Sequence, residues 1–157
     1  MGAPWETQDK APWETEEETS DVKPGEKLDF FDNVKQNDYL AHKMLDFMIK
    51  CDGVGLAAPQ VGISRRLFVM EIDRVSHFIF NPVITYYSDA KIVGTEGCLS
   101  YPGEFITVPR SKNIAGTYQN YRGELINFEI NGGLLSVCFQ HEYDHLDGIV
   151  MHDRTTV

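Results

Sequence analysis

The chain has 157 residues, of which 42% are hydrophobic and 11% aromatic, a composition typical of one globular domain rather than of a disordered chain. Fourteen Lys and Arg residues stand against twenty-four Asp and Glu residues, and the net charge of −10 argues against a nucleic-acid-binding surface. No stretch is apolar enough to span a membrane, and the N-terminus resembles neither a signal peptide nor a transit peptide. The three cysteines fit a reducing compartment better than a disulfide framework, so we expect a cytoplasmic protein.

The first segment of the chain is polar, acidic and contains proline. The string APWET occurs twice, at residues 3–7 and 11–15, but two short copies do not make a repeat architecture. We therefore expect residues 1–26 to form a weakly structured acidic arm and residues 27–157 to form a single domain.

Two helices are predicted, one near each end of that domain. Apolar residues recur at helical spacing from about Asn33 to Cys51, and the DGVG that follows ends this helix. From Leu134 to Leu146 there is no Gly or Pro, and apolar residues fall along one face together with two histidines. The second helix is therefore expected to be buried and to end at Gly148.

The segments between the helices are rich in β-branched and aromatic residues. RRLFVMEI, HFIFNPVITYY and NIAGTYQNYRG predict strands, and RGELINFEI resembles the second arm of a hairpin. A helix, several strands and then a buried helix indicate an α+β fold, with antiparallel or mixed sheets around the central helix.

The second helix carries QHEYDHLDG, which contains the pattern H-E-x-x-H. On a helix, His141 and His145 lie on one face about one turn (~6 Å) apart and can share one metal ion. Glu142 lies beside that site, where it can take a proton from water. An isolated match can also be a polar helix face that arises by chance, but the helix is apolar around this one, and burying these groups without partners would be costly.

Zinc peptidases are the most familiar enzymes with this pattern, and their third ligand is not found here. The pattern H-E-x-x-H-x-x-G-x-x-H accepts Gly148, but His152 comes one residue too late for it. One residue rotates a side chain by about 100° on a helix, so the register matters. The other large class takes a glutamate from a downstream helix, and too few residues follow His152 to form one.

The upstream sequence offers a cysteine as the third ligand. Cys98 lies in TEGCLSYPG, a loop or strand end where its thiolate could complete a catalytic site with two imidazoles and a water. Taken alone, it could equally be an ordinary buried cysteine. GVGLAAPQVG is a Gly- and Ala-rich loop whose backbone can approach a substrate closely, with Gln60 as its polar side chain.

Together, GVGLAAPQVG, EGCLS and QHEYDHLDG resemble, in order and separation, the three signature motifs of the peptide deformylases. The similarity runs from about Tyr39 to Val150. The resemblance implies a hydrolase that removes the formyl group from N-formylmethionyl peptides of nascent chains and releases formate, by attack of metal-bound water. The domain at residues 27–157 would then be the catalytic domain.

The resemblance also implies the role of each matching residue. Cys98, His141 and His145 would hold one divalent metal, typically Fe²⁺, with Zn²⁺, Ni²⁺ or Co²⁺ as substitutes. Glu142 would be the general base and acid, while Gln60 and the backbone N–H of Leu99 would stabilise the oxyanion. Six residues are expected to bind substrate, through the backbone or as an apolar pocket for methionine: Gly53, Val54, Gly55, Leu134, Val137 and Cys138. The last three, with Val54, could equally be ordinary core.

Glu96 and Arg110 occupy positions that form a supporting ion pair in this family, the alternative being a solvated surface pair. The basic residue that commonly follows EGCLS is replaced by GEF, which ends at Phe105. Many bacterial members continue into a long C-terminal helix, which we do not expect here because nine residues follow Gly148. The chain therefore resembles the short, phage-encoded forms, which would place it in a host cytoplasm.

We expect a monomer that binds formylmethionyl peptides, makes at most a transient encounter with the ribosome exit region, and contacts neither nucleic acid nor membrane. Two alternatives are a zinc endopeptidase and a catalytically silent metal-binding scaffold. An intact Glu142 and Gln60 argue against the silent scaffold.

Overall fold

The computed structural model describes residues 34–155. The predicted acidic arm at residues 1–26, and the domain boundary after it, lie outside the described residues. Within the described range, no helix is both long enough and apolar enough to cross a bilayer.

Two α-helices, two short 3-10 helices and seven strands make up this part of the chain. In chain order they are α1 (Val34–Lys50), β1 (Gly55–Ala57), η3 (Ala58–Val61), β2 (Leu67–Ile72), β3 (Val75–Tyr87), β4 (Lys91–Cys98), β5 (Tyr101–Ser111), β6 (Asn113–Gln119), β7 (Leu125–Asn131), α2 (Gly133–Leu146) and η4 (Met151–Arg154). Both predicted helices and the β6–β7 hairpin are confirmed, and Gly148, with φ 74°, follows the end of α2.

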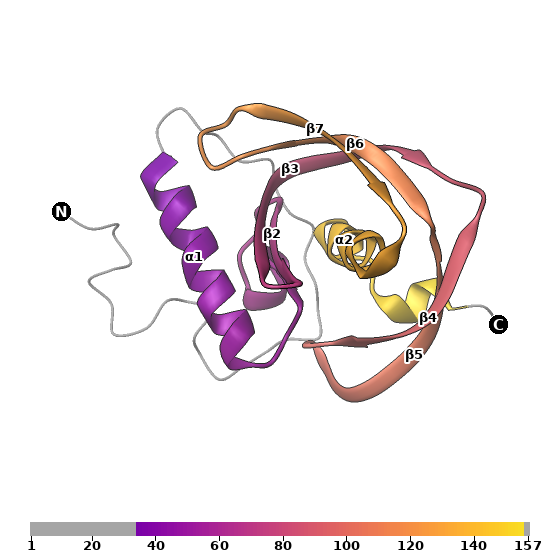
Figure 1. Cartoon of the computed structure of the whole chain (residues 1–157). Helices are drawn as coiled ribbons and strands as arrows, with labels where there is room; N and C mark the ends of the chain where they lie inside the picture. The colour runs from indigo at the N-terminus through magenta and orange to yellow at the C-terminus, as the bar shows by residue number, and fades with distance from the viewer. Residues whose placement is uncertain (1–33, 156–157) are drawn as a thin grey trace.

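The strands form a five-stranded sheet in the order β1-β2-β3-β6-β7 and a separate two-stranded sheet of β4 and β5. Every pairing is antiparallel, which narrows the prediction of antiparallel or mixed sheets. Figure 1 shows α2 end-on near the centre, with the larger sheet curving around it, the β4–β5 hairpin on its other side and α1 outside the sheet. The α+β fold with a buried central helix is confirmed.

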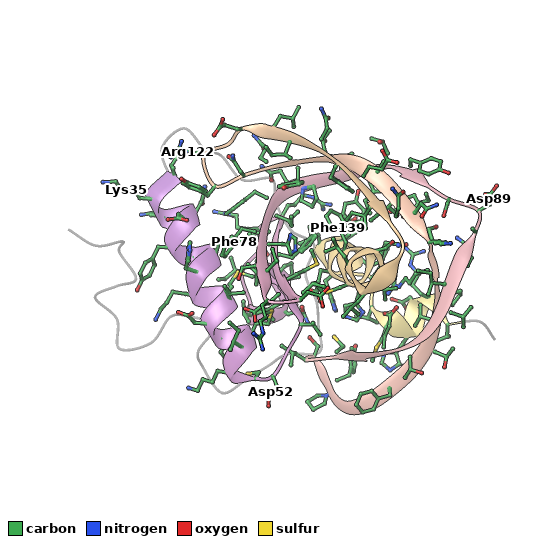
Figure 2. The ribbon with its side chains drawn as sticks, viewed as in Figure 1. Lys35, Asp52, Phe78, Asp89, Arg122 and Phe139 are labelled. Carbon is green, nitrogen blue, oxygen red and sulfur yellow. The ribbon has the colours of Figure 1, made fainter. Side chains whose placement is uncertain are left out.

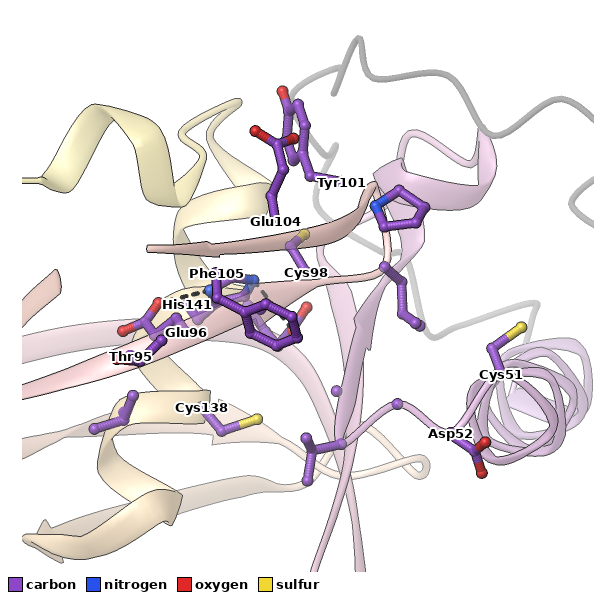
Figure 3. Close-up of a pocket in the computed structure, with 18 of the residues that line it drawn as sticks. Cys51, Asp52, Thr95, Glu96, Cys98, Tyr101, Glu104, Phe105, Cys138 and His141 are labelled. Atoms are coloured by element: carbon purple, nitrogen blue, oxygen red, sulfur yellow. Dashed lines mark hydrogen bonds and ion pairs between the residues drawn. The ribbon is translucent and has the colours of Figure 1, made fainter. Parts of the chain in front are cut away.

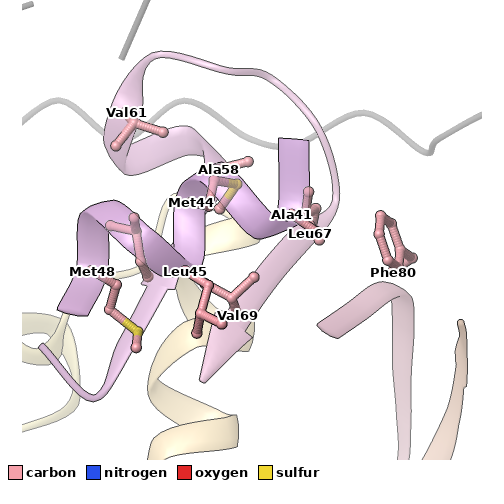
Figure 4. Close-up of a cluster of buried hydrophobic side chains, with 10 residues drawn as sticks. Ala41, Met44, Leu45, Met48, Ala58, Val61, Leu67, Val69 and Phe80 are labelled. Carbon is pink, nitrogen blue, oxygen red and sulfur yellow. The ribbon is translucent and has the colours of Figure 1, made fainter. Parts of the chain in front are cut away.

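Strand β2 is buried on both faces because each face packs against a different helix. Leu67 and Val69 belong to the apolar cluster formed with α1, whose members are drawn in Figure 4. Phe68 and Met70 point the other way and join the cluster formed with α2. That second cluster includes Phe139, which Figure 2 labels on α2 near the middle of the molecule. The apolar run of β2 therefore holds α2 in place relative to α1 and the sheet.

The sequence did not predict the β4–β5 hairpin as strands. Gly94, Gly97, Pro102 and Pro109 lie within it, and such residues usually indicate turns. Strand β1 was likewise assigned to a glycine-rich loop, although it pairs with β2. In both places, pairing with a neighbouring strand outweighs the low β-propensity of the local sequence.

Candidate metal centre and active site

The three predicted metal ligands converge, although they come from two separate elements. Cys98 ends β4, whereas His141 and His145 are one turn apart on α2. Their donor atoms all lie within 4.8 Å of one another. The Cys98 Sγ is 3.3 Å from His145 Nε2, and the Nε2 atoms of the two histidines are 3.1 Å apart.

These separations fit a shared metal ion. Metal–nitrogen distances of about 2.0–2.1 Å in tetrahedral geometry place two ligand nitrogens roughly 3.3 Å apart. One thiolate and two imidazoles also leave a fourth position open, as catalytic sites require. Within residues 34–155, this is the one group of donors close enough together to bind a metal.

Glu96 fixes the orientation of the His141 ring. Its Oε1 lies 2.8 Å from His141 Nδ1, so Nδ1 carries the proton and Nε2 presents its lone pair towards Cys98 and His145. Arg110 in turn donates two hydrogen bonds to Glu96, at 2.9 and 3.0 Å. Glu96 and Arg110 are buried, so the alternative of a solvated surface pair is wrong.

The ion pair extends into a longer buried network. Arg110 also donates to Asp144 Oδ2 at 2.5 Å, and Asp144 accepts two further bonds from Arg154, each at 3.1 Å. Burial opposes the charged form of Glu96, but hydrogen bonds from His141 and Arg110 lower its pKa overall. The network thus ties β4 and β5 to α2 and includes His141, one of the candidate metal ligands.

The pKa values of the two histidines shift in opposite directions. Burial lowers the pKa of His141, but hydrogen bonds to Cys98 and Glu96 outweigh it and raise the pKa to about 10. Burial, reinforced by repulsion from His141, lowers the pKa of His145 to about 3. Without a metal ion, the two rings thus share one positive charge, carried by His141, and a divalent cation would have to replace the proton on His141 Nε2.

Glu142 lies beside this centre and is 3% exposed. Its Oε1 is 3.9 Å from His141 Nε2, and its Oε2 is buried with no hydrogen-bond partner among the described residues. Burial raises the pKa of Glu142 to about 7, although attraction to His141 counteracts part of this shift. A carboxyl group with a pKa near neutrality can both accept and donate a proton.

The glycine in β1 makes room for Glu142. A Cβ on Gly55 would lie 2.7 Å from Glu142 Oε1 and 2.9 Å from Cys138 Sγ. Both atoms belong to side chains buried on α2, so at least one of these side chains would have to shift. Gly55 is therefore required by close packing against the candidate base.

Gln60 is held with its amide nitrogen towards the site. The backbone N–H of Ala57 donates to Gln60 Oε1 at 2.8 Å, which fixes which end of the amide faces outward. Its Nε2 is 3.4 Å from Cys98 Sγ and 2.9 Å from Ser100 Oγ. Gln60 is 4% exposed, so it is a fixed donor rather than a mobile surface group.

A pocket of about 620 Å³ opens over these residues, and Figure 3 shows it between the β4–β5 hairpin and the segment that follows α1. All six predicted substrate-binding residues line it, as do Leu99, Glu142 and His141. Val54 and Leu134 are 45% and 56% exposed, so they form the pocket rim rather than ordinary core. Cys138 is buried at the floor, where burial raises the pKa of its thiol well above the usual value.

Several supporting residues were not singled out from the sequence. Asp144 lies on α2 within the H-E-x-x-H pattern and is buried. An acidic residue on a buried helix face needs a charged partner, and this could have indicated its role from the sequence. Gln140 hydrogen-bonds the backbone of Ser111 at 2.8 and 3.2 Å and so joins α2 to β5. His152, which was out of register for a metal ligand, lies outside the donor group.

Comparison with known proteins gives a consistent result. Residues 19–157 match the model of the polypeptide deformylase family. A peptide deformylase from Thermotoga sp. (strain RQ2) is 46% identical over 133 residues, which cover 85% of this chain and 77% of that protein. The crystal structure of peptide deformylase from Thermotoga maritima superposes with a TM-score of 0.81 at 40% identity, covering 87% of this chain and 90% of that one. A probable peptide deformylase from Synechococcus phage S-SSM7 superposes with a TM-score of 0.78 at 37% identity, covering 85% and 91%. The chain belongs to the polypeptide deformylase family.

Proposed function

We propose that this deformylase removes the formyl group from N-formylmethionyl peptides with Cys98, His141 and His145 as its metal ligands. The convergence of one thiol and two imidazoles beside a buried carboxyl group is the observation that carries this proposal. When bound, a divalent cation supplies Lewis acidity, which polarises a carbonyl group and lowers the pKa of water. Fe²⁺ is the expected ion, one per chain, although Zn²⁺, Ni²⁺ and Co²⁺ also suit this donor set.

Glu142 would act as general base and then as general acid. Its pKa of about 7 suits it to take a proton from the attacking water and to deliver that proton to the amine that leaves when formate is released. The proton stays near the reacting atoms because the carboxyl group is enclosed by α2 and Gly55.

Gln60 and the Leu99 backbone would stabilise the negative oxygen of the tetrahedral intermediate. Gln60 Nε2 is already oriented by the Ala57 amide, so little reorganisation is needed. Leu99 follows Cys98 directly, and its N–H is the natural second donor. Loss of one such donor typically costs about 3–4 kcal/mol of transition-state stabilisation.

The peptide would bind in an extended form between two strand edges. Strand β1 is at the end of the larger sheet, and β4 pairs only with β5 among the described strands. Both line the pocket, through Gly55 and through Gly97 and Cys98. A substrate strand could therefore pair with either edge, with the methionine side chain against Val137 and Cys138.

We also propose that the protein works as a cytoplasmic monomer, with residues 27–157 as its single catalytic domain. The net charge of −10 disfavours lasting attachment to ribosomal RNA, so any encounter with the ribosome exit region would be transient.

The decisive test is formate release from formyl-Met-Ala-Ser by anaerobically prepared protein loaded with Fe²⁺ or Ni²⁺. Glu142→Gln should lose activity by about 10²–10⁴-fold, because general acid–base catalysis contributes that much, while its metal content stays unchanged. Glu129→Gln, at an exposed position on β7, is the matched control. Metal binding without formate release by the unaltered protein would support the silent scaffold, and cleavage of unformylated Met-Ala-Ser would support a peptidase.

A further inference from the structure

His152 connects the β4–β5 hairpin to the C-terminal turn η4. Its Nε2 lies 3.2 Å from Glu104 Oε1, and its ring packs against Tyr101 with the centroids 4.5 Å apart. Both partners belong to the hairpin tip, near the start of β5. His152 Nδ1 is buried and has no partner among residues 34–155, so Nε2 is the ring nitrogen that donates, to the Glu104 carboxylate.

The hairpin tip needs such an anchor. Strands β4 and β5 form a sheet of their own, and an isolated pair of strands is only marginally stable in water. The far end of the hairpin is fixed by the buried Arg110 network, but the tip is largely exposed. Gln60 contacts the tip through Ser100, and His152 contacts it through Glu104.

The anchor acts on a residue that faces the pocket. Figure 3 shows Glu104 and Tyr101 on one side of the hairpin and Phe105 on the other. Phe105 lines the pocket, as Tyr101 and Glu104 also do, and is 74% exposed. Its ring would lie 3.2 Å from a Cβ placed on Gly97. Glu104 and Phe105 are adjacent, so holding one carboxylate fixes the direction in which the neighbouring ring points.

The position of Phe105 indicates which part of a substrate it would contact. The candidate metal ligands are deep in the site, with His141 7% and His145 0% exposed. Phe105, Val54 and Leu134 form the exposed apolar rim of the same pocket. If the formyl group of a substrate lies at the metal ligands, the residues after methionine would therefore contact this rim.

We propose that His152 is a positioning residue for peptide binding: by holding Glu104 and Tyr101 it sets Phe105 against the residues that follow formylmethionine. This inference rests on the proposed function. His152 touches neither the reacting atoms nor the metal ligands, so its effect should appear in KM for peptides rather than in kcat.

The test compares two substrates and a matched control. In His152→Ala, KM for formyl-Met-Ala-Ser should rise about fivefold, as expected for loss of an exposed pair and a ring contact. Formylmethionine amide, which does not reach the rim, should show no change in KM, and kcat and metal content should be unchanged with both. His42→Ala is the control, because His42 likewise pairs with an acid, Asp38, and packs on a ring, Phe78, but lies on α1.

Two further measurements distinguish the loss of this contact from a general loss of folding. The single variant Glu104→Gln should also raise KM for the tripeptide. The double variant should have a KM no higher than that of His152→Ala, because both substitutions break the same His152–Glu104 contact. Amide hydrogen exchange at residues 103–105, measured without substrate, should accelerate in His152→Ala.

Each outcome separates this inference from the activity itself. An unchanged KM for the tripeptide, or equal losses on both substrates, would overturn the positioning role. If the unaltered protein releases no formate while exchange still accelerates in the variant, the proposed function fails and the contact alone stands.

Discussion

The two walls of the pocket are built in different ways. One wall, β1 and α2, belongs to the main core: β1 pairs with β2, and α2 packs its apolar side on the five-stranded sheet. The other wall, the β4–β5 hairpin, shares no strand pairing with that sheet. It is held instead by side chains, above all by Arg110 between Glu96 and Asp144.

This difference matters because the candidate metal ligands are divided between the walls. His141 and His145 come from the packed helix, whereas Cys98 comes from the hairpin. The geometry of the site therefore depends on how firmly the second wall is attached to the first. Four perturbations test how the two walls differ.

The largest effect is expected from Arg110→Met. Removing this buried cation leaves Glu96 and Asp144 without their shared partner, and breaking a buried pair from one side costs about 3–5 kcal/mol. We expect the free energy of unfolding to fall by that amount, as measured by denaturant titration. A loss below about 1 kcal/mol, the range of exposed pairs, would show that the hairpin is held by other contacts.

Metal removal should loosen the second wall more than the first. The ion would join Cys98 on the hairpin to His141 and His145 on α2, so it acts as a link between the walls. An ion present at about a thousandfold excess over its Kd adds about 4 kcal/mol of stability. For a chain of this size that corresponds to roughly 10 °C in Tm.

Calorimetry with and without a chelator measures this shift, and hydrogen exchange locates it. Exchange should accelerate in β4 and β5 and stay slow in β2, which is buried on both faces. Cys98→Ser provides the control, because the chelator should change its Tm much less. Uniform acceleration across all strands would contradict a link between the walls.

A third change tests the packed wall. Gly55→Ala places a methyl group 2.7 Å from Glu142 Oε1, and this proposed base must shift to accommodate it. A displacement of about 1 Å in a catalytic group can cost on the order of 10²-fold in rate, so kcat should fall by that factor with metal content retained. Gly94→Ala on β4 is the matched control, since a Cβ there meets nothing within 4 Å. Equal activity of the two variants would argue against close packing as the reason for Gly55.

In the packed wall, α2 was predicted from sequence, whereas β1 was assigned to a glycine-rich loop. The periodicity from Leu134 to Leu146 predicts a helix, and helical geometry alone brings His141 and His145 together. The apolar run of β2 likewise indicates a strand buried on both faces.

The hairpin wall could not be predicted in the same way. Its glycines and prolines suggest loops, and its attachment depends on Arg110 and Asp144, which are 34 residues apart in the chain. No local pattern encodes a contact of that range. Cys98 was recognised because its motif resembles that of a known family, and the fold decides between the two places expected for it, a loop or a strand end, in favour of the strand end.

The smallest effect is expected from Arg66→Met, which removes another Arg–Asp ion pair, this one at the packed wall. Arg66 donates to Asp147 Oδ1 at 2.7 Å and to the Leu146 carbonyl at 3.3 Å, at the C-terminal end of α2. Its side chain is 20% exposed and that of Asp147 47%, so water can replace the arginine in a way that it cannot at Arg110. We expect a loss of at most about 1 kcal/mol in the free energy of unfolding, measured by the same denaturant titration. A loss equal to that of Arg110→Met would mean that burial does not set the energetic difference between the two arginines. The hairpin would then depend on its side-chain contacts no more than α2 does.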